Sequence, residues 1–398
     1  MNNLIVILLT LLVLSSCGKK ANDNASTTAS DADKKAFVEN YANIVFANYE
    51  DSYNEALKME KAIKDFLAAP DAEKMEIAKK AWIAAREPYG QTEAFRFAGG
   101  PIDDEDGPEG ALNAWPLDEN YVDYVRGSDK SGIINDPEKY PEIKAEILES
   151  LNEQGGEKNI SIGYHAIEFL LWGQDDLDTK LKTPGKRPHT DFIKGGTAAN
   201  QERRAEYLKA TTEILIKNLK EMVDEWDPKG KDNYRSKLLA MDADEAIKGI
   251  LTGIGTLSKS ELAGERMIVA LDNQDQEDEH SCFSDNTHRD IILNALGIAN
   301  VIKGSYKRVD GSVISGKSLI DLVKVADEAH AKELEELATN TVKNTEAIPV
   351  PFDLALTAET VGGNGPIMTS VKALQKQGDV ITTAASKLGI KIGTALPE

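Results

Sequence analysis

The sequence predicts an all-α protein, a two-lobed helical-bundle fold with an internal pseudo-repeat. Apolar residues recur at helical spacing along several long segments of the 398-residue chain. Alternating patterns typical of β-strands are scarce, and proline and glycine gather in loops between the helical segments. The chain is long enough for two domains of ordinary size, so two bundles side by side are the architecture that we expect.

The N-terminal segment is typical of an export signal. Residues 4–14 (LIVILLTLLVL) are too short for a membrane span but have the length of a signal-peptide core. Small residues then precede Cys17, as in the lipobox at which bacteria acylate a cysteine. We therefore expect a signal peptide at 1–16 and a lipidated Cys17 with a flexible tether at 17–33. A plain signal peptide that happens to contain a cysteine is the alternative.

A lipidated chain would be held on a membrane of the cell envelope, in the periplasm or at the outer-membrane surface. Its body would consist of an N-terminal bundle at 34–200 and a C-terminal bundle at 201–398. The first bundle opens with an apolar helical face made by Phe37, Tyr41, Ile44, Val45, Ala56, Met59, Ile63 and Phe66. Comparable faces in the second bundle lie at 243–257, 319–337 and 371–388.

A weak repeat, offset by about 170 residues, relates the two bundles. FVENYANIVF at 37–46 aligns with YLKATTEILI at 207–216, and WIAAREPYGQTEA at 82–94 aligns with ILTGIGTLSKSEL at 250–262. The second alignment places Glu93 over Glu261. Two similar bundles would enclose a cleft between them. A chance match between unrelated amphipathic helices remains the alternative explanation.

The charge balance limits the classes of partner. The chain has 46 Lys and Arg against 67 Asp and Glu, so the net charge is 46 − 67 = −21. A nucleic-acid binder would need a basic surface, so this class is excluded. The excess of carboxylates favours cations or high solubility. Two cysteines cannot form a disulfide framework, and a lipidated Cys17 would leave Cys282 alone.

One segment matches a nucleotide-binding motif in sequence but lacks the structural context that the motif requires. Residues 311–318 (GSVISGKS) match the phosphate-loop consensus GxxxxGK[ST]. A phosphate loop follows a buried strand of a parallel sheet, and residues 300–310 do not have that pattern. We therefore expect no nucleotide here, and predict that Ser315 caps a helix that begins near Lys317.

The most informative segment is SIGYHAIEFLLWGQD at 161–175. On a helix, His165 and Glu168 share a face, and together they can bind one divalent or trivalent metal ion. Because the flanking residues are apolar, this polar pair is expected to be buried and to need a metal or a salt-bridge network as partner. The zinc-peptidase patterns HExxH and HxxEH both fail, because Ala166 and Phe169 stand where they require Glu or His.

Charged residues in two other regions are candidates for the cleft and for its supporting contacts. Those of the second half are Arg266, His288 and Asp290, and those of the first half are Arg86, Arg96 and Asp191. Ordinary salt bridges and an acidic, solvated loop with a helix cap are the simpler interpretation of these residues. The segment 285–287 precedes a helix that we expect to begin near His288.

The motif at 163–168 resembles the hallmark GxHxxE of the imelysin family, and the similarity is greatest to the iron-regulated protein A type. Further matching segments follow in order along the mature chain. They are Trp82, Ala85 and Arg86 leading into EAFRF at 93–97, PEGALNAWPLDENYVDYV at 108–125, GKRP at 185–188, GIGTLSKSELAGERM at 253–267 and DQEDEHSCFSDNTHRDI at 275–291.

The resemblance implies a two-lobed helical fold with GxHxxE at the junction, and a role in bacterial iron uptake. It also implies that Glu93 joins His165 and Glu168 as a metal ligand, a donor set that suits iron, with zinc as the alternative. The leading hypothesis is an exported lipoprotein that binds iron or an iron-bearing ligand between its lobes and passes it to a transport protein.

Two other functions stay open at this point. In a metallopeptidase, the metal would polarise a water molecule and Glu168 or Glu93 would act as the general base. In an interaction module without metal, the cleft would dock a partner protein or haem.

Overall fold

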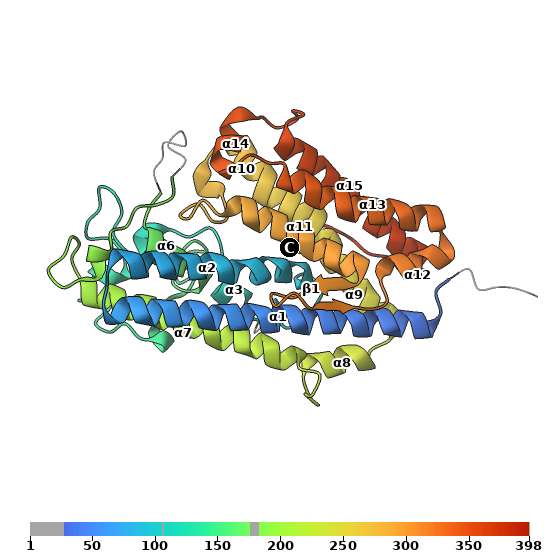
Figure 1. Cartoon of the computed structure of the whole chain (residues 1–398), viewed down its shortest axis with the longest axis horizontal. Helices are drawn as coiled ribbons and strands as arrows, with labels where there is room; N and C mark the ends of the chain where they lie inside the picture. Colours follow the sequence, from blue (N-terminus) through green and yellow to red (C-terminus); the bar gives the residue numbers. More distant parts are fainter. Residues whose placement is uncertain (1–27, 106, 176–182, 398) are drawn as a thin grey trace, which may run out of the picture.

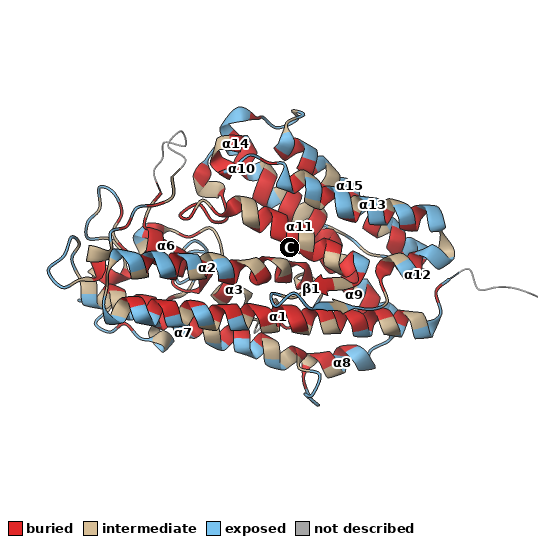
Figure 2. Cartoon of the chain, viewed as in Figure 1, coloured by how far each residue is buried: buried red, intermediate tan, exposed pale blue. Residues whose placement is uncertain are grey.

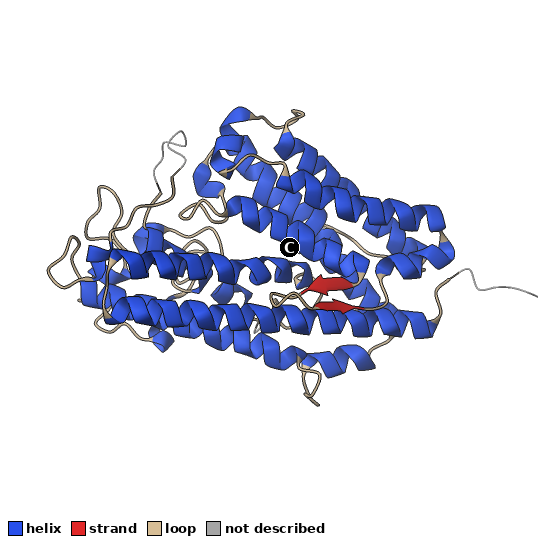
Figure 3. Ribbon diagram, viewed as in Figure 1, coloured by secondary structure: helices blue, strands red, loops and turns tan. Residues whose placement is uncertain are grey.

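The computed structural model describes residues 28–105, 107–175 and 183–397. The predicted signal peptide, Cys17 and most of the predicted tether lie outside these residues. Apart from loops, the described chain consists of helices and one two-stranded antiparallel hairpin, which confirms the predicted fold class (Figure 3). Within the described ranges, no helix combines the length and the apolar character that a membrane crossing requires.

Two long helices form the frame of the first half. A short connection joins α1 to α2, and Asp71 begins α2 by accepting a hydrogen bond from the backbone N–H of Lys74. The short elements that follow connect α2 to α6. In order, the elements are α1 (Asp31–Ala68), α2 (Ala72–Thr92), η1 (Glu93–Phe95), α3 (Glu109–Leu112), α4 (Glu119–Val122), η2 (Ile133–Asn135), α5 (Ala145–Leu151), α6 (Gly163–Trp172) and η4 (His189–Phe192).

The second half adds helices on both sides of this frame. Its elements are α7 (Gln201–Trp226), α8 (Tyr234–Ala240), α9 (Ala243–Thr256), η5 (Leu257–Ile268), α10 (Val269–Asn273), η6 (Gln276–Asp278), α11 (Thr287–Lys303), β1 (Ser305–Lys307), β2 (Val313–Ser315), α12 (Leu319–Ala326), α13 (Glu328–Glu346), α14 (Phe352–Ala358) and α15 (Pro366–Lys387). Helix α7 lies along α1, and α13 lies along α15 (Figure 1). Helix α15 also packs against η5. Helix α11 packs against both α13 and α2, so it joins the two groups of helices.

The predicted apolar faces make the core (Figure 2). All eight predicted core residues of the first helix, from Phe37 to Phe66, are buried. The predicted faces of the second half are buried as well, except that Ala326 and Leu337 are half-buried. The boundary predicted between 200 and 201 stays a prediction, and α7, which starts there, contacts α1 and α6 of the first half.

Helices α9, η5 and α10 follow one another without a break as one continuous helix, and its middle part is a π-helix. Residues Leu257–Ile268 are wound with i→i+5 hydrogen bonds, and ordinary α-helix precedes and follows them. Ser258 fixes this stretch to α15, because its hydroxyl donates to the carbonyl oxygen of Leu374 at 2.8 Å. A π-helical stretch often marks a functional part of a helix, and the side chains that it presents are described below.

The region of the phosphate-loop pattern corrects one prediction. Ser315 was predicted to cap a helix, but this was wrong, since Ser315 ends β2 and pairs with Ser305 of β1. The helix α12 begins at Leu319, and Ser318 caps it in a reciprocal pair with Asp321. The sequence contains serines at both positions, and the hairpin decides which of them is free to cap.

Candidate ligand site at the junction of the two halves

The GxHxxE motif forms the first turns of α6, a helix that is buried on every face. Gly163 begins the helix with φ +91°, and a Cβ at this position would lie 2.8 Å from the carbonyl oxygen of Leu112. A residue with a side chain would therefore be strained and would also clash. Within the first two turns of α6, Nδ1 of His165 lies 2.9 Å from Oε2 of Glu168, the contact that their spacing predicts.

Glu168 joins α6 to the loop before α11. Its other oxygen, Oε1, accepts hydrogen bonds from the backbone N–H of Ser284 at 2.9 Å and from the Ser284 hydroxyl at 2.7 Å. Burial raises the pKa of Glu168 to about 8, although these hydrogen bonds oppose the shift. The carboxyl group of the motif is thus fully engaged by His165 and by the second half of the chain.

An aromatic cluster surrounds His165. The ring of Trp115 lies edge-on to His165, His280 and Phe283, and the rings of His165 and His280 are in direct contact, with centroids 4.9 Å apart. Burial lowers the pKa of both histidines well below the ordinary value, and nearby arginines act in the same direction. Both rings are therefore neutral at neutral pH.

Three nitrogen atoms of this cluster have no hydrogen-bond partner among the described protein groups. They are Nε1 of Trp115, Nε2 of His165 and Nδ1 of His280. Each belongs to a side chain that is largely or fully buried, where an unsatisfied polar group is costly. A ligand bound at the junction would supply partners for these three nitrogen atoms.

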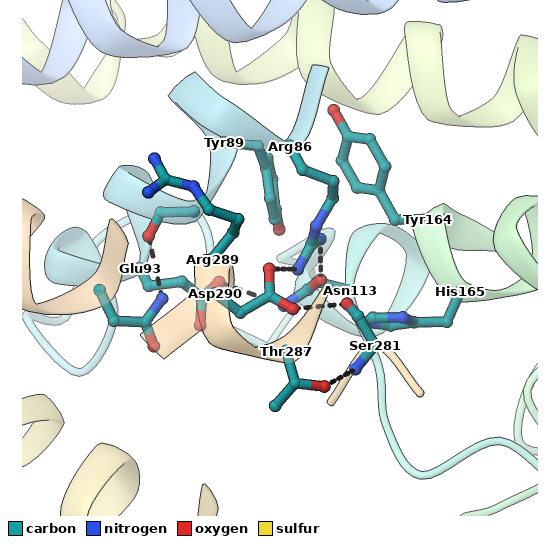
Figure 4. Close-up of polar contacts among 12 residues, drawn as sticks. Arg86, Tyr89, Glu93, Asn113, Tyr164, His165, Ser281, Thr287, Arg289 and Asp290 are labelled. Carbon is teal, nitrogen blue, oxygen red and sulfur yellow. Dashed lines mark hydrogen bonds and ion pairs between the residues drawn. The ribbon is translucent and has the colours of Figure 1, made fainter. Parts of the chain in front are cut away.

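Next to this cluster, the side chain of Arg86 in α2 contacts residues of the second half of the chain. Its guanidinium lies between the rings of Tyr89 and Tyr164 and binds Asp290 at 2.8 Å and the side-chain oxygen of Asn113 (Figure 4). The hydroxyl of Ser281 donates to the other oxygen of Asp290. All of these groups are buried, so Arg86 and Asp290 form a supporting ion pair for the loop that carries His280.

A second ion network also spans the junction. Arg266 of η5 binds Glu93 of the first half at 2.6 Å and Glu261 of its own helix at 2.9 Å. Arg96 lies 3.6 Å from Glu93 and 3.0 Å from Glu109. Burial raises the pKa of Glu93, but Arg266 and Arg96 outweigh it and hold that pKa below its usual range. Glu93 is therefore an ionised partner of two arginines.

Two adjoining cavities open at this junction, with volumes of about 340 and 360 Å³. Trp115, Pro116, Glu261, Arg266 and His280 line both of them. The remaining charged residues of the walls are Arg96, Glu109, Glu153, Glu157, Glu265 and Asp278. Carboxylates thus outnumber guanidinium groups among the described residues of the walls, which favours ligands with cationic character.

The predicted ligands Glu93, His165 and Glu168 do not surround a common point in this conformation. Glu93 is paired with Arg266, and Glu168 is paired with Ser284 and with Nδ1 of His165. In the described part of the chain, no group of three or more His, Cys, Asp or Glu side chains is placed to hold a metal ion. Among the predicted ligands, His165 alone keeps a donor atom without a protein partner, Nε2.

The other predicted site residues divide into two sets. Arg86, Arg96, Arg266 and Asp290 lie in the networks around the cavities. His288 bonds through Nδ1 to the carbonyl oxygen of Asp285 and does not line either cavity. Asp191 belongs to a separate buried network, in which it contacts Arg187 at 3.3 Å and the hydroxyl of Tyr124 at 2.6 Å.

The sequence predictions did not assign Asn113, Trp115 or Ser284 to the site, and they placed His280 in a polar loop for which a solvated surface was the simpler interpretation. These residues come from loops that no periodic pattern describes. The two segments that carry these residues are NAWP at 113–116 and EHSCFSDN at 279–286. Both segments belong to the stretches that carry the family resemblance.

Residues 45–381 of the chain match the family model described as Imelysin. The chain belongs to the imelysin family. A similar curated protein is Iron-regulated protein A of Synechococcus elongatus, which is 25% identical over 346 residues, 85% of this chain and 82% of that protein. The predicted resemblance is therefore confirmed.

Solved structures show the same imelysin-like fold. A crystal structure described as an iron-regulated protein A precursor from Parabacteroides distasonis has a TM-score of 0.69 at 19% identity and covers 92% of this chain and 97% of that chain. An imelysin-like protein from Psychrobacter arcticum has a TM-score of 0.60 at 14% identity and covers 92% and 98%. At these identities the similarity concerns the fold.

Proposed function

We propose that this imelysin-family protein binds iron, or an iron-bearing ligand, in the cavities between its halves and acts in bacterial iron acquisition. The iron is cargo, to be taken up and then released to a transport protein. The observation that carries the proposal is the cluster of Trp115, His165 and His280, whose buried nitrogen atoms have no partner among the described protein groups.

The chemistry of the surrounding groups supports this cargo. Imidazole nitrogens and carboxylate oxygens are donors that suit iron, with zinc as the alternative. The carboxylates of Glu109, Glu261, Glu265 and Asp278 on the cavity walls would attract a cationic species. The name of the similar protein from Synechococcus elongatus indicates regulation by iron, which is consistent with a role in iron acquisition.

A titration of the mature chain tests the proposal. Equilibrium dialysis against ferrous iron, ferric citrate and zinc, followed by metal analysis, should show binding of iron at micromolar concentrations. His165→Ala should weaken that binding, whereas His189→Ala, a histidine of η4 outside the cavities, should not. Absence of iron binding by the wild-type chain would refute the proposal. Turnover of peptides that depends on bound metal would instead support the metallopeptidase alternative.

We also propose that the chain is anchored in the cell envelope through lipid on Cys17. The apolar run at 4–14 and the small residues before Cys17 support this. The wild-type chain should fractionate with membranes and incorporate labelled fatty acid. Cys17→Ser should do neither, and equal labelling of the two chains would contradict the anchor.

A further inference from the structure

His280 brings a second imidazole to the motif histidine from the other half of the chain. The two ring centroids are 4.9 Å apart and the ring planes meet at 72°. His280 is 8% exposed and lines both cavities, and His165 lies behind it at 1% exposure. Each ring has a buried nitrogen without a protein partner, Nε2 of His165 and Nδ1 of His280.

The spacing of the two rings is that of neighbouring ligands on one metal ion. Imidazole nitrogens bind metals at about 2.0–2.1 Å, which places two adjacent ring centroids on one ion roughly 4.5–5 Å apart. The 4.9 Å between His165 and His280 falls in this range. Two imidazoles that merely fill a core would normally satisfy both nitrogens with protein hydrogen bonds, and these two rings do not.

The carboxyl group of Glu168 orients His165 for such a role. A histidine that binds a metal through one nitrogen commonly bonds to a carboxylate through the other, which fixes the orientation of the ring. Nδ1 of His165 makes this contact with Glu168, at 2.9 Å, and leaves Nε2 for a ligand. Glu168 is therefore a positioning residue in this arrangement, and Ser284 holds its second oxygen.

The protein supplies too few donors to hold a bare ion. Zinc sites in proteins use three or four protein ligands, and no group of three or more such side chains occurs in the described ranges 28–105, 107–175 and 183–397. A metal ion that already carries the donor atoms of a chelator needs only two further ligands from the protein. Cavities of about 340 and 360 Å³ beside His280 have the size of small-molecule sites.

We propose that His165 and His280 together bind a metal chelate that has two adjacent exchangeable positions, one imidazole from each half of the chain. The inference rests on the proposed function and names its cargo class as a small, incompletely saturated chelate. Because one donor comes from each half, the bound chelate would also bridge the halves.

Two chelators that differ in the number of positions they leave open provide the test. Nitrilotriacetate leaves two adjacent positions on an octahedral metal, whereas EDTA leaves essentially none. The mature chain should bind the nitrilotriacetate complexes of ferric iron and of cobalt(II) and should not bind the EDTA complexes. Isothermal titration gives the affinities, and the visible d–d bands of the cobalt complex report whether imidazole has entered the metal's coordination sphere.

Variants distinguish the loss of a histidine ligand from the loss of the folded structure. His280→Ala and His280→Gln should each weaken binding of the nitrilotriacetate complexes by at least about tenfold and abolish the change in the cobalt spectrum. His288→Ala is the matched control, because its ring already bonds to Asp285 and lies outside the cavities. Unfolding curves of all variants identify any loss that is due to misfolding, and the cobalt spectrum of the wild-type chain does not depend on a variant.

The outcomes distinguish this inference from the proposed function. Iron binding by the wild-type chain that His280→Ala leaves unchanged, or equal binding of the EDTA complexes, would overturn the chelate inference and leave the proposed function standing. Failure of the wild-type chain to bind any iron probe would overturn both.

Discussion

Glu168 accepts two hydrogen bonds from Ser284, a residue 116 positions further along the chain. One bond comes from the backbone and one from the hydroxyl, so a single carboxyl group fixes both the path of the loop at 279–286 and the side chain of Ser284. The other oxygen of Glu168 holds His165. The hallmark motif therefore contributes to the connection between the two halves, whatever ligand the cavities bind.

Removing this carboxyl group should destabilise the protein strongly. Glu168→Ala leaves the N–H and hydroxyl of Ser284 and Nδ1 of His165 without a partner in a buried place, at a cost of about 3–5 kcal/mol. Glu168→Gln keeps an acceptor for Ser284 and should cost less. Urea unfolding measures both. Glu87→Ala, which removes a half-exposed partner of Arg289, is the control and should cost about 0–1 kcal/mol. Similar losses for Glu168→Ala and Glu87→Ala would contradict the role of the Ser284 contact.

Arg266 should contribute to the stability of the fold mainly because it neutralises the buried carboxylate of Glu93. Arg266→Met leaves a buried carboxylate without its closest partner, so we expect a loss of about 3–5 kcal/mol in unfolding free energy. The double variant Glu93→Gln with Arg266→Met should recover part of this loss, since the unpaired charge is then absent. Recovery is the decisive measurement, and a double variant as unstable as the sum of the single ones would show that the pair does not interact.

Gly163 should not tolerate a side chain. At φ +91°, alanine is strained by roughly 1–3 kcal/mol, and its Cβ would also approach the carbonyl oxygen of Leu112. Gly163→Ala should therefore lower the thermal midpoint and also shift His165, which a change in the histidine NMR signals would reveal. Gly264→Ala is the matched control, because no other group lies within 4 Å of a Cβ placed there. Equal midpoints for the two variants would argue against the strain.

Glu119 should make stability depend on pH. Burial raises its pKa to about 7, and the nearby Glu277 adds to the shift. Because the folded state binds this proton more tightly than the unfolded state, the contribution to stability is complete below about pH 4.5 and is lost as the pH rises through 7. Unfolding free energies measured from pH 4.5 to 8 should fall less steeply for Glu119→Gln than for the wild type. The exposed Glu202→Gln should follow the wild-type slope, and parallel slopes for all three chains would refute this assignment.

Helical periodicity predicted the fold well because it records which face of each helix is buried. The face from Phe37 to Phe66 is buried along the whole of α1, and the faces at 243–257 and 371–388 are buried in the same way. The hairpin at 305–315 was missed, since its strands are three residues each and too short to show alternation. Its position in turn moved the helix cap from Ser315 to Ser318.

The site could be predicted only in part, because its contacts join segments that are far apart in the chain. The spacing of His165 and Glu168 is local, so the sequence contains that contact. The contacts of His165 with Trp115 and His280 depend on how three segments pack, and no local pattern records them. The pairing of Glu93 with Arg266 has the same origin, since the two residues are 173 positions apart.

The helix type of η5 decides which charges face each other on one wall of the cavities. Glu261 and Arg266 are five residues apart, whereas side chains on an α-helix meet at spacings of three or four. Winding with i→i+5 bonds brings this pair to one side, and Nε of Arg266 lies 3.0 Å from Oε1 of Glu261. If the same residues were wound as an α-helix, the five-residue spacing would turn Glu261 and Arg266 to different faces of the helix with no change in composition. The electrostatic character of the wall is thus set by the pitch of a helix as much as by the residues on it.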